Sequence, residues 1–135
     1  MHEWALAEAI IKTIDNVAKE KGEKIFRVIV KVGELQQIEN DILEFALNEL
    51  KKEYTLNDVE IVLEEEPAVL RCRVCGYEWK FRDNLANLDP LIAESIHFIP
   101  ESVHAFIKCP SCGSPDFEIV KGRGVWIEEI EFEGE

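Results

Sequence analysis

Long apolar runs are missing from this 135-residue sequence. The longest unbroken apolar run is four residues, Trp4 to Ala7, whereas a helix that crosses a bilayer needs about 20. No leader with a basic start, an apolar middle and a small-residue end opens the chain. We therefore expect a soluble, cytoplasmic protein that does not act on membranes.

Basic residues are scarce. The chain has 15 Lys and Arg against 28 Asp and Glu, which gives a formal net charge of -13. Such a chain repels phosphate, which disfavours nucleic acids and anionic membranes as partners. Residues 67–121 hold six basic and seven acidic side chains, while the remainder holds nine and 21. This uneven split predicts two units with different surfaces.

The common catalytic motifs are also absent. The sequence contains neither the phosphate-binding G-x-x-x-x-G-K-[ST] loop nor H-E-x-x-H. Glu34, Glu39 and Asp41 form a small acidic set, but nothing in the sequence arranges a nucleophile or a base around them. We expect that the protein is not an enzyme.

Apolar periodicity predicts a helix–strand–helix–strand order before Pro67. Gly22 is placed to end the first helix, and the spacing of Asp41 and Glu44 is that of a capping box at the start of the second. The alternation from Phe26 to Val32 indicates a strand with Phe26 on its apolar face. The predicted elements are helices over 3–21 and from Asp41 to before Asn57, with strands over 25–33, 59–63 and 125–132.

All the cysteines lie in the middle of the chain, in two C-x2-C pairs separated by 33 residues. A two-residue gap lets one tight turn aim both sulfurs at one point, and Gly76 and Gly113 supply the positive φ that such turns often need. Two such knuckles form a tetrahedral four-sulfur site, which structural Zn²⁺ prefers. The predicted zinc ligands are Cys72, Cys75, Cys109 and Cys112.

Three other interpretations of the cysteines stay open at this point. They are a pair of disulfides, which intracellular reduction opposes, a redox-active C-x-x-C, which normally stands alone at a helix start, and an iron or iron–sulfur centre, which uses similar ligands. Zinc is favoured because a small unit gains its stability from a metal cross-link.

The predicted fold is α+β, with two helices packed on a small sheet and an inserted zinc-ribbon-like four-cysteine domain. The boundaries are 1–66 plus 122–135 for the first domain and 67–121 for the second. Residues 83–103 are expected to be irregular and partly helical. Residues 104–121, which begin with His104, are expected to form a strand, a cysteine pair and a strand. The segment Lys121-Gly122-Arg123-Gly124 is interpreted as a hinge.

The N-terminus offers a second metal site. Methionine removal generally requires a small second residue, so the chain is expected to keep Met1 ahead of His2. The Met1 amine, the His2 backbone nitrogen and the His2 imidazole then form a planar three-nitrogen chelate, with Glu3 or another histidine in the fourth position. Ni²⁺ and Cu²⁺ suit that geometry and Zn²⁺ does not. The alternatives are that His2 is an uninvolved terminal residue and that Glu3 only favours the helix dipole.

The other two histidines carry weaker signals. His97 lies in the apolar stretch Ser95-Ile96-His97-Phe98-Ile99, where a packed core histidine is the simpler interpretation than a ligand. His104 has no chemistry assigned to it.

A basic, aromatic cluster near the first cysteine pair suggests a rival function as a zinc-ribbon module that binds nucleic acid or another protein. Aromatic side chains stack on bases, although they also fill the cores of small domains. The cluster consists of Arg71, Arg73, Tyr77, Trp79, Lys80, Phe81 and Arg82.

Taken together, these motifs resemble the HypA family of hydrogenase nickel-incorporation proteins. The resemblance rests on Met1-His2-Glu3, Val32-Gly33-Glu34-Leu35, the two C-x2-C pairs and Lys121-Gly122-Arg123-Gly124. It extends from residue 1 to about 132. It implies a nickel metallochaperone, built from a nickel-binding α+β domain and a zinc domain, that delivers Ni²⁺ to the large subunit of nickel–iron hydrogenase.

The resemblance also implies roles for particular residues. Nickel would be bound by Met1, His2 and Glu3, and His97 matches a further nickel ligand of archaeal-type members with a long loop between the cysteine pairs. The four cysteines would hold structural zinc. The implied partner is the nickel-handling GTPase HypB, and some bacterial members also serve urease. The chain is expected to be a monomer or a weak, domain-swapped homo-oligomer.

Overall fold

The computed structural model describes residues 3–36, 38–85 and 88–134, apart from the side chains of Leu85, His97 and Pro100. The chain forms two compact units. Unit 1 comprises Met1–Lys31, Ile38–Glu64 and Trp126–Glu135, and unit 2 comprises Val32–Gln37 and Glu65–Val125. The predicted α+β class is confirmed, whereas the functional domains at 1–66 plus 122–135 and at 67–121 stay a prediction.

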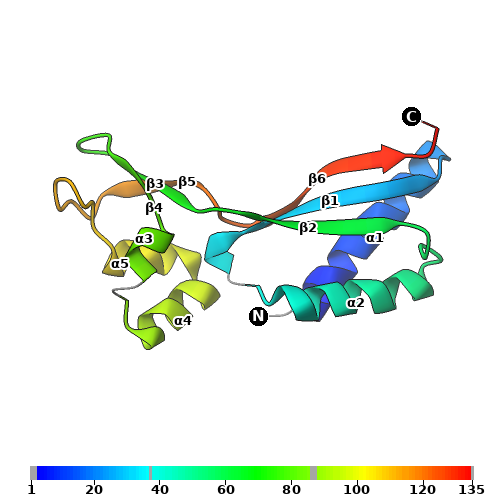
Figure 1. Cartoon of the computed structure of the whole chain (residues 1–135), viewed down its shortest axis with the longest axis horizontal. Coiled ribbons are helices and arrows are strands. Elements are labelled where there is room, and N and C mark those ends of the chain that lie inside the picture. The colour runs from blue at the N-terminus through cyan, green and yellow to red at the C-terminus, as the bar shows by residue number, and fades with distance from the viewer. Residues whose placement is uncertain (1–2, 37, 86–87, 135) are drawn as a thin grey trace. The chain divides into compact units, whose positions relative to one another are not determined.

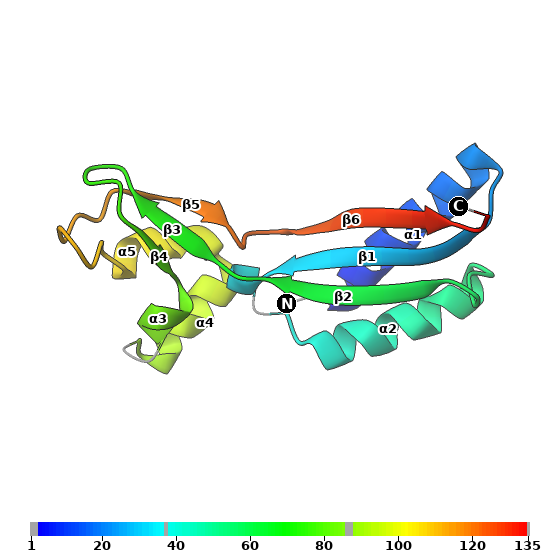
Figure 2. The same ribbon diagram turned by 45° about the horizontal axis from the view of Figure 1, so that its top comes forward.

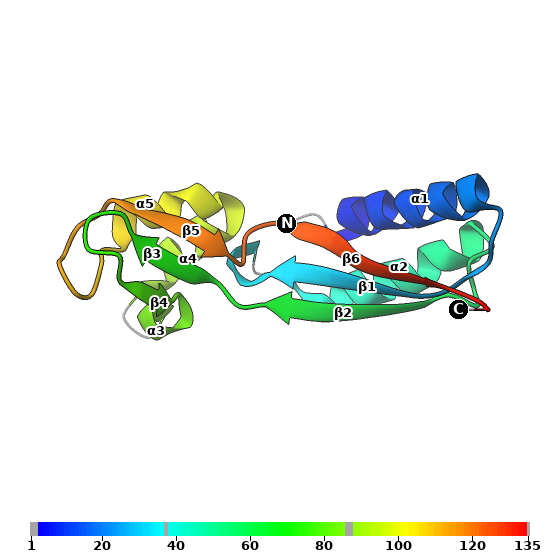
Figure 3. The same cartoon turned by 90° about the horizontal axis from the view of Figure 1, so that it is seen from above.

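Unit 1 is a three-stranded sheet with two helices on one face (Figure 1). The strands follow the order β2-β1-β6, so the last strand of the chain lies beside the first. Seen from above, the strands run in front of α2 (Figure 3). The elements are α1 (Glu3–Lys21), β1 (Ile25–Gly33), α2 (Asn40–Glu53), β2 (Glu60–Glu66) and β6 (Val125–Phe132).

The first helix forms as its pattern predicts. Ala7, Ile10 and Ile14 recur at helical spacing and are buried. The helix ends at Gly22, whose φ of 64° suits a C-terminal glycine and whose N–H donates to the Ala18 carbonyl at 2.9 Å. No helix among residues 3–36, 38–85 and 88–134 is long and apolar enough to cross a membrane.

The capping box predicted for the second helix is wrong. α2 begins at Asn40, and Glu39 is its N-cap residue, without a side-chain cap. The Glu39 carbonyl accepts the first hydrogen bond of the helix, from the N–H of Leu43 at 3.0 Å, as an N-cap carbonyl normally does. The buried face of Leu43, Ala46 and Leu47 holds the helix on the unit, as packing does for most protein helices.

Two aromatic residues of unit 1 are partly exposed, among them Phe26, which was predicted to lie on the apolar face of its strand. Phe26 is 44% exposed, since Ile25 takes the buried position at the start of β1. The Arg27 guanidinium lies 4.9 Å from the centre of the Phe26 ring, a cation–π distance. Trp4 is half exposed and packs edge to face on Phe45, with ring centroids 6.0 Å apart.

Unit 2 is a second three-stranded sheet, of order β4-β3-β5, in which β3 is antiparallel to both neighbours. Short helices lie on one side of it (Figure 2). Its elements are η1 (Glu34–Gln36), β3 (Val69–Cys72), β4 (Glu78–Lys80), α3 (Arg82–Leu85), α4 (Pro90–Phe98), η2 (Pro100–Ser102), α5 (Val103–Phe106) and β5 (Phe117–Lys121).

The partly helical character predicted for 83–103 is confirmed. Asp89 caps α4, because its side chain accepts the N–H of Leu91 at 2.8 Å. The strand predicted at His104 is wrong, since residues 103–106 form α5. Val103 and Ile107, four residues apart, are both buried, a spacing that places them on one face of a helical turn.

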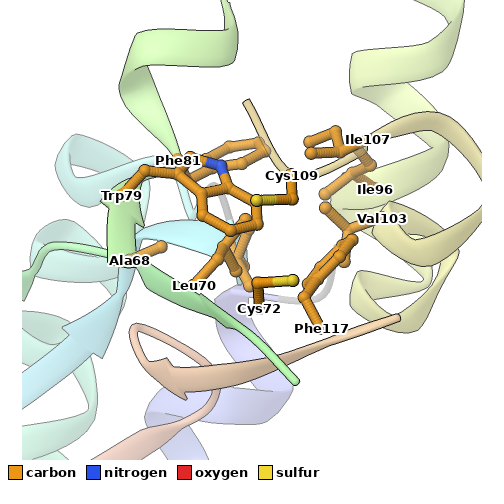
Figure 4. Close-up of a cluster of buried hydrophobic side chains, with 11 residues drawn as sticks. Ala68, Leu70, Cys72, Trp79, Phe81, Ile96, Val103, Ile107, Cys109 and Phe117 are labelled. Atoms are coloured by element: carbon orange, nitrogen blue, oxygen red, sulfur yellow. The ribbon is translucent and has the colours of Figure 1, made fainter. Parts of the chain in front are cut away.

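The core of unit 2 gathers side chains from nearly every element (Figure 4). Leu70 and Phe117 come from the sheet and Ile96 from α4, and all three are fully buried. Cys72 and Cys109 lie in the same cluster. Leu35 of η1 is also fully buried there, so a segment far from the cysteines in sequence forms part of their core.

The segment Gly33–Gln36, which we term the strap, is bonded to the segment expected to be a hinge. The N–H of Gly33 donates to the Gly124 carbonyl at 2.7 Å, and the N–H of Leu35 donates to the Gly122 carbonyl at 2.9 Å. In return the N–H of Gly124 donates to the Gln36 side chain at 3.1 Å. The two glycine-containing segments therefore form a clasp, and residues 121–124 are not a free linker.

Because the two backbones lie so close together, any side chain at position 33 should destabilise the fold. A Cβ on Gly33 would lie 2.4 Å from the Gly122 carbonyl oxygen, a backbone atom that cannot rotate away. Gly33→Ala should lower the free energy of unfolding by about 1–3 kcal/mol, as overpacking does, measured by urea denaturation. Glu23→Ala is the control, because the Glu23 side chain is exposed. Equal midpoints for Gly33→Ala and wild type would contradict the clasp.

Candidate metal centre

The four cysteines lie on two loops at the same end of the unit 2 sheet, the green and gold loops of Figure 2. One ligand atom from each residue lies within 4.8 Å of the others. Cys72 and Cys109 are buried, whereas Cys75 and Cys112 are exposed. The predicted convergence of the two pairs is therefore present.

The two knuckles have the same backbone design. In the first, the N–H of Cys72 donates to the Tyr77 carbonyl at 2.9 Å and the N–H of Gly76 donates to the Cys72 carbonyl at 3.0 Å. In the second, Cys109 donates to Ser114 and Gly113 donates to Cys109, both at 2.8 Å. The sequence spacing alone is thus enough to build each turn.

Gly76 and Gly113 hold these turns closed. Their φ angles are 79° and 77°, in the left-handed region that side chains other than glycine avoid. A Cβ at either position would meet nothing within 4 Å. The backbone angle, and not a lack of space, requires glycine at these two positions.

Backbone N–H groups point at the first sulfur of each pair. Cys72 Sγ accepts from the N–H groups of Val74 and Cys75 at 3.3 and 3.4 Å. Cys109 Sγ accepts in the same way from Ser111 and Cys112, at 3.3 and 3.5 Å. Sequence reasoning did not anticipate these bonds, although the C-x2-C spacing implies them. Such bonds favour the thiolate, which is the metal-binding form.

The pKa values of the thiols shift accordingly. The N–H of Cys75 lowers the pKa of Cys72 to about 7, against the opposing effect of burial. Burial raises the pKa of Cys109, but the N–H groups of Cys112 and Ser111 outweigh it, so that the pKa is lowered. These shifts favour the thiolate form of the first cysteine in each pair.

Cys112 shifts in the opposite direction. A backbone bond from Ser114 lowers its pKa, but the neighbouring Cys72 sulfur, burial and the other two sulfurs raise it to about 12. Like charges this close cannot all ionise unless a cation lies among them. A divalent ion would supply that charge, and its binding would displace the remaining thiol protons.

The sulfur positions also fit a tetrahedral ion. The four cysteines are free thiols, and the nearest sulfurs across the two knuckles are Cys72–Cys112 at 3.5 Å and Cys75–Cys109 at 3.6 Å. A disulfide bond is only about 2.05 Å long. A tetrahedron with metal–sulfur distances of about 2.3 Å has sulfur–sulfur edges of about 3.8 Å. The site therefore fits a thiophilic ion such as Zn²⁺.

The described part of the structure does not show the other predicted metal ligands near one another. Met1 and His2 lie outside them, and Glu3 is the first residue of α1. His97 belongs to α4, but its side chain also lies outside the described part. His104 is exposed on α5 and stacks on Phe117, with ring centroids 4.4 Å apart.

The basic cluster that suggested a nucleic-acid surface is largely neutralised. Arg71 Nε donates to Glu118 at 2.8 Å, and Arg73 lies 3.4 Å from Asp116. Trp79 is buried, and its Nε1 donates to Asn84 at 2.8 Å. The arginines are thus paired with carboxylates and the indole fills the core, which weighs against base stacking by these residues.

An α+β unit joined to a unit with two cysteine knuckles defines a class: small metal-binding proteins with a zinc-ribbon-like domain. The particular family follows from the comparisons. Residues 1–132 match the family described as "HypA: Hydrogenase/urease nickel incorporation, metallochaperone, hypA". The chain belongs to the HypA family, and the resemblance seen in the sequence is confirmed.

Two relatives are similar to this chain along their whole length. Hydrogenase maturation factor HypA of Pyrococcus horikoshii is 53% identical over 136 residues, with 100% of this chain and 98% of the relative covered. The protein of the same name in Pyrococcus abyssi is 54% identical with the same coverage. The family is one of nickel-incorporation metallochaperones, and these relatives are named as hydrogenase maturation factors.

Solved structures show the same fold. The solution structure of the Ni metallochaperone HypA from Helicobacter pylori matches with a TM-score of 0.61 and 21% identity, and all of both chains is covered. A second solution structure, of a protein named HypA, gives a TM-score of 0.65, also at 21% identity, with 100% of this chain and 98% of that chain covered. At this level of identity the comparison concerns the fold alone.

The four-sulfur site predicts which side chains are needed for metal. Cys112→Ser should abolish the single tightly bound metal ion per chain, because a neutral hydroxyl replaces a thiolate ligand. Ser111→Ala is the matched control, since only its backbone N–H contacts a sulfur. Elemental analysis after dialysis against a weak chelator measures the result and identifies the metal. Full metal content in Cys112→Ser would contradict the site.

Proposed function

We propose that this protein is a nickel metallochaperone that binds Ni²⁺ at its N-terminus and delivers it for maturation of nickel–iron hydrogenase. The observation that carries the proposal is the family match, which begins at residue 1 and therefore includes Met1, His2 and Glu3. The structural neighbour from Helicobacter pylori, which is named as a Ni metallochaperone, supports it.

The start of α1 suits this chemistry. The first helical residue is Glu3, and the first four N–H groups of an α-helix have no acceptor within the helix. The amides at the chain start are therefore not committed to the helical ladder. The Met1 amine, the His2 amide nitrogen and the His2 imidazole would bind Ni²⁺ in a plane, with the Glu3 amide or carboxylate nearby.

We assign the four-cysteine site to structural Zn²⁺. Two of its sulfurs are buried in the core of unit 2, and a cross-link there stabilises a small domain. Nickel would be the cargo, held at an open terminal site from which ligands exchange readily. The two ions thus have separate chemistry and separate roles.

The proposal includes the recipients and partners of the nickel. The hydrogenase large subunit would receive the ion, and the GTPase HypB would act with this chain, which lacks a phosphate-binding loop of its own. The protein would work in the cytoplasm, without binding nucleic acid or membranes, as a monomer or a weak homo-oligomer. A zinc-ribbon module that binds another protein is the alternative.

Nickel titration of the untagged, zinc-loaded protein tests the terminal site. Wild type should bind one Ni²⁺ per chain, and His2→Gln should lose it, because glutamine leaves Met1 in place but removes the imidazole. Isothermal calorimetry measures the binding, with His104→Ala as the control for loss of an unrelated histidine. Equal nickel binding by wild type and His2→Gln would contradict the proposal and favour the protein-binding alternative.

His97 has its own test. His97→Ala should weaken nickel binding while zinc content stays at one ion per chain, because the substitution removes an imidazole nitrogen and leaves all four cysteines in place. The same titration, paired with elemental analysis, measures both quantities. Unchanged nickel affinity in this variant would remove His97 from the site.

A further inference from the structure

Glu34 is the most enclosed carboxylate among the described ion pairs. Its side chain is only 10% exposed, and both of its oxygens have partners. Oε1 accepts the N–H of Ala68 at 2.8 Å, and Oε2 lies 3.4 Å from Nε of Arg82. A largely enclosed carboxylate with a backbone donor and a guanidinium beside it is held in one position.

These contacts join three segments of unit 2. Glu34 begins η1 in the strap, Ala68 directly precedes β3, and Arg82 begins α3. Arg82 also reaches Glu65, at 3.0 Å, but Glu65 is half exposed. Of the two carboxylates on Arg82, Glu34 is thus the one that ties the strap to the rest of the unit.

The strap in turn contacts the helix that carries His97. Leu35, the next residue, is fully buried in the cluster that contains Ile96 of α4, and η1 and α4 are in contact. Ile96 directly precedes His97. The strap that carries Glu34 and the helix that carries His97 therefore share one buried cluster.

α4 depends on such contacts for its position. It has nine residues, fewer than the roughly 12–15 at which isolated helices become even marginally stable in water. Leu91 and Ile99 are largely exposed, so they do not anchor it. The buried side of the helix, around Ile96, must do so, and there the strap is its neighbour.

We propose that Glu34 is a positioning residue for the nickel site, because it fixes the strap against α4 and thereby sets where His97 lies. The inference rests on the proposed function, and it adds a residue to which no metal-binding role has been assigned. Glu34 itself does not bind nickel in this scheme.

Graded variants test the positioning role in the untagged, zinc-loaded protein. Glu34→Ala removes both contacts and should lower the nickel affinity by about tenfold, the size typical of groups that orient a metal ligand. Glu34→Gln keeps an acceptor for the Ala68 N–H but loses the charge opposite Arg82, so its loss should be smaller. Glu65→Ala is the matched control, since it removes the other Arg82 carboxylate and should leave nickel affinity unchanged.

The decisive experiment repeats Glu34→Ala in a His97→Ala background, with nickel affinity measured by calorimetry and zinc by elemental analysis. If Glu34 acts through His97, its substitution should then have no further effect, because the ligand it positions is gone. A loss of the same size in both backgrounds would show a general structural effect and overturn the inference. If Glu34→Ala loses zinc, Glu34→Gln takes its place in the cycle.

The outcomes separate this inference from the proposed function. Stoichiometric nickel binding that requires His2 but is indifferent to Glu34→Ala and Glu34→Gln overturns the positioning role alone. Failure of the wild type to bind nickel overturns the proposed function, and the positioning role with it.

Discussion

Mutual repulsion among four sulfur atoms is the constraint on which the rest of unit 2 depends. The sulfurs lie within 4.8 Å of one another, with the pKa of Cys72 lowered to about 7 and that of Cys112 raised to about 12. Four thiolates this close need a cation among them, and once it is bound it joins two loops that are distant in sequence. The small core then has a cross-link to close it, as small domains generally require.

The second constraint is the position of the strap, which requires the backbones of two segments to lie very close together. Gly33 can pass the Gly122 carbonyl only because Gly33 carries no side chain, and a Cβ on Gly122 would in turn meet Ala68. Hydrogen bonds from Gly33 and Leu35 to Gly124 and Gly122 hold the two segments together. A segment that follows directly from β1 thus becomes part of the core around Cys72 and Cys109. Close packing explains Gly33 and Gly122, whereas a positive φ of 89° explains Gly124.

Features that depend on residues close together in the sequence could be predicted from the sequence. The apolar spacing of Ile10 and Ile14 identified α1, and the spacing of the cysteines and their following glycines identified both knuckles. Features that depend on contacts between distant parts of the chain were predicted wrongly or not at all. Ile25 takes the buried position expected for Phe26, α2 begins at Asn40 without the expected capping box, and α5 forms where a strand was expected at His104. The clasp joins residues about 90 positions apart, so no pattern of neighbouring residues predicts it. The same holds for Glu34, which in the sequence is one acidic residue among 28 Asp and Glu.

The central claim is that one small chain keeps two metal ions in chemically distinct sites, one of sulfur in unit 2 and one of nitrogen at the N-terminus. X-ray absorption at the zinc and nickel edges of the doubly loaded protein tests it most directly. We expect four sulfur neighbours about 2.3 Å from zinc and a nickel shell of nitrogen and oxygen without sulfur. Sulfur in the nickel shell, or nitrogen around the zinc, would contradict the claim.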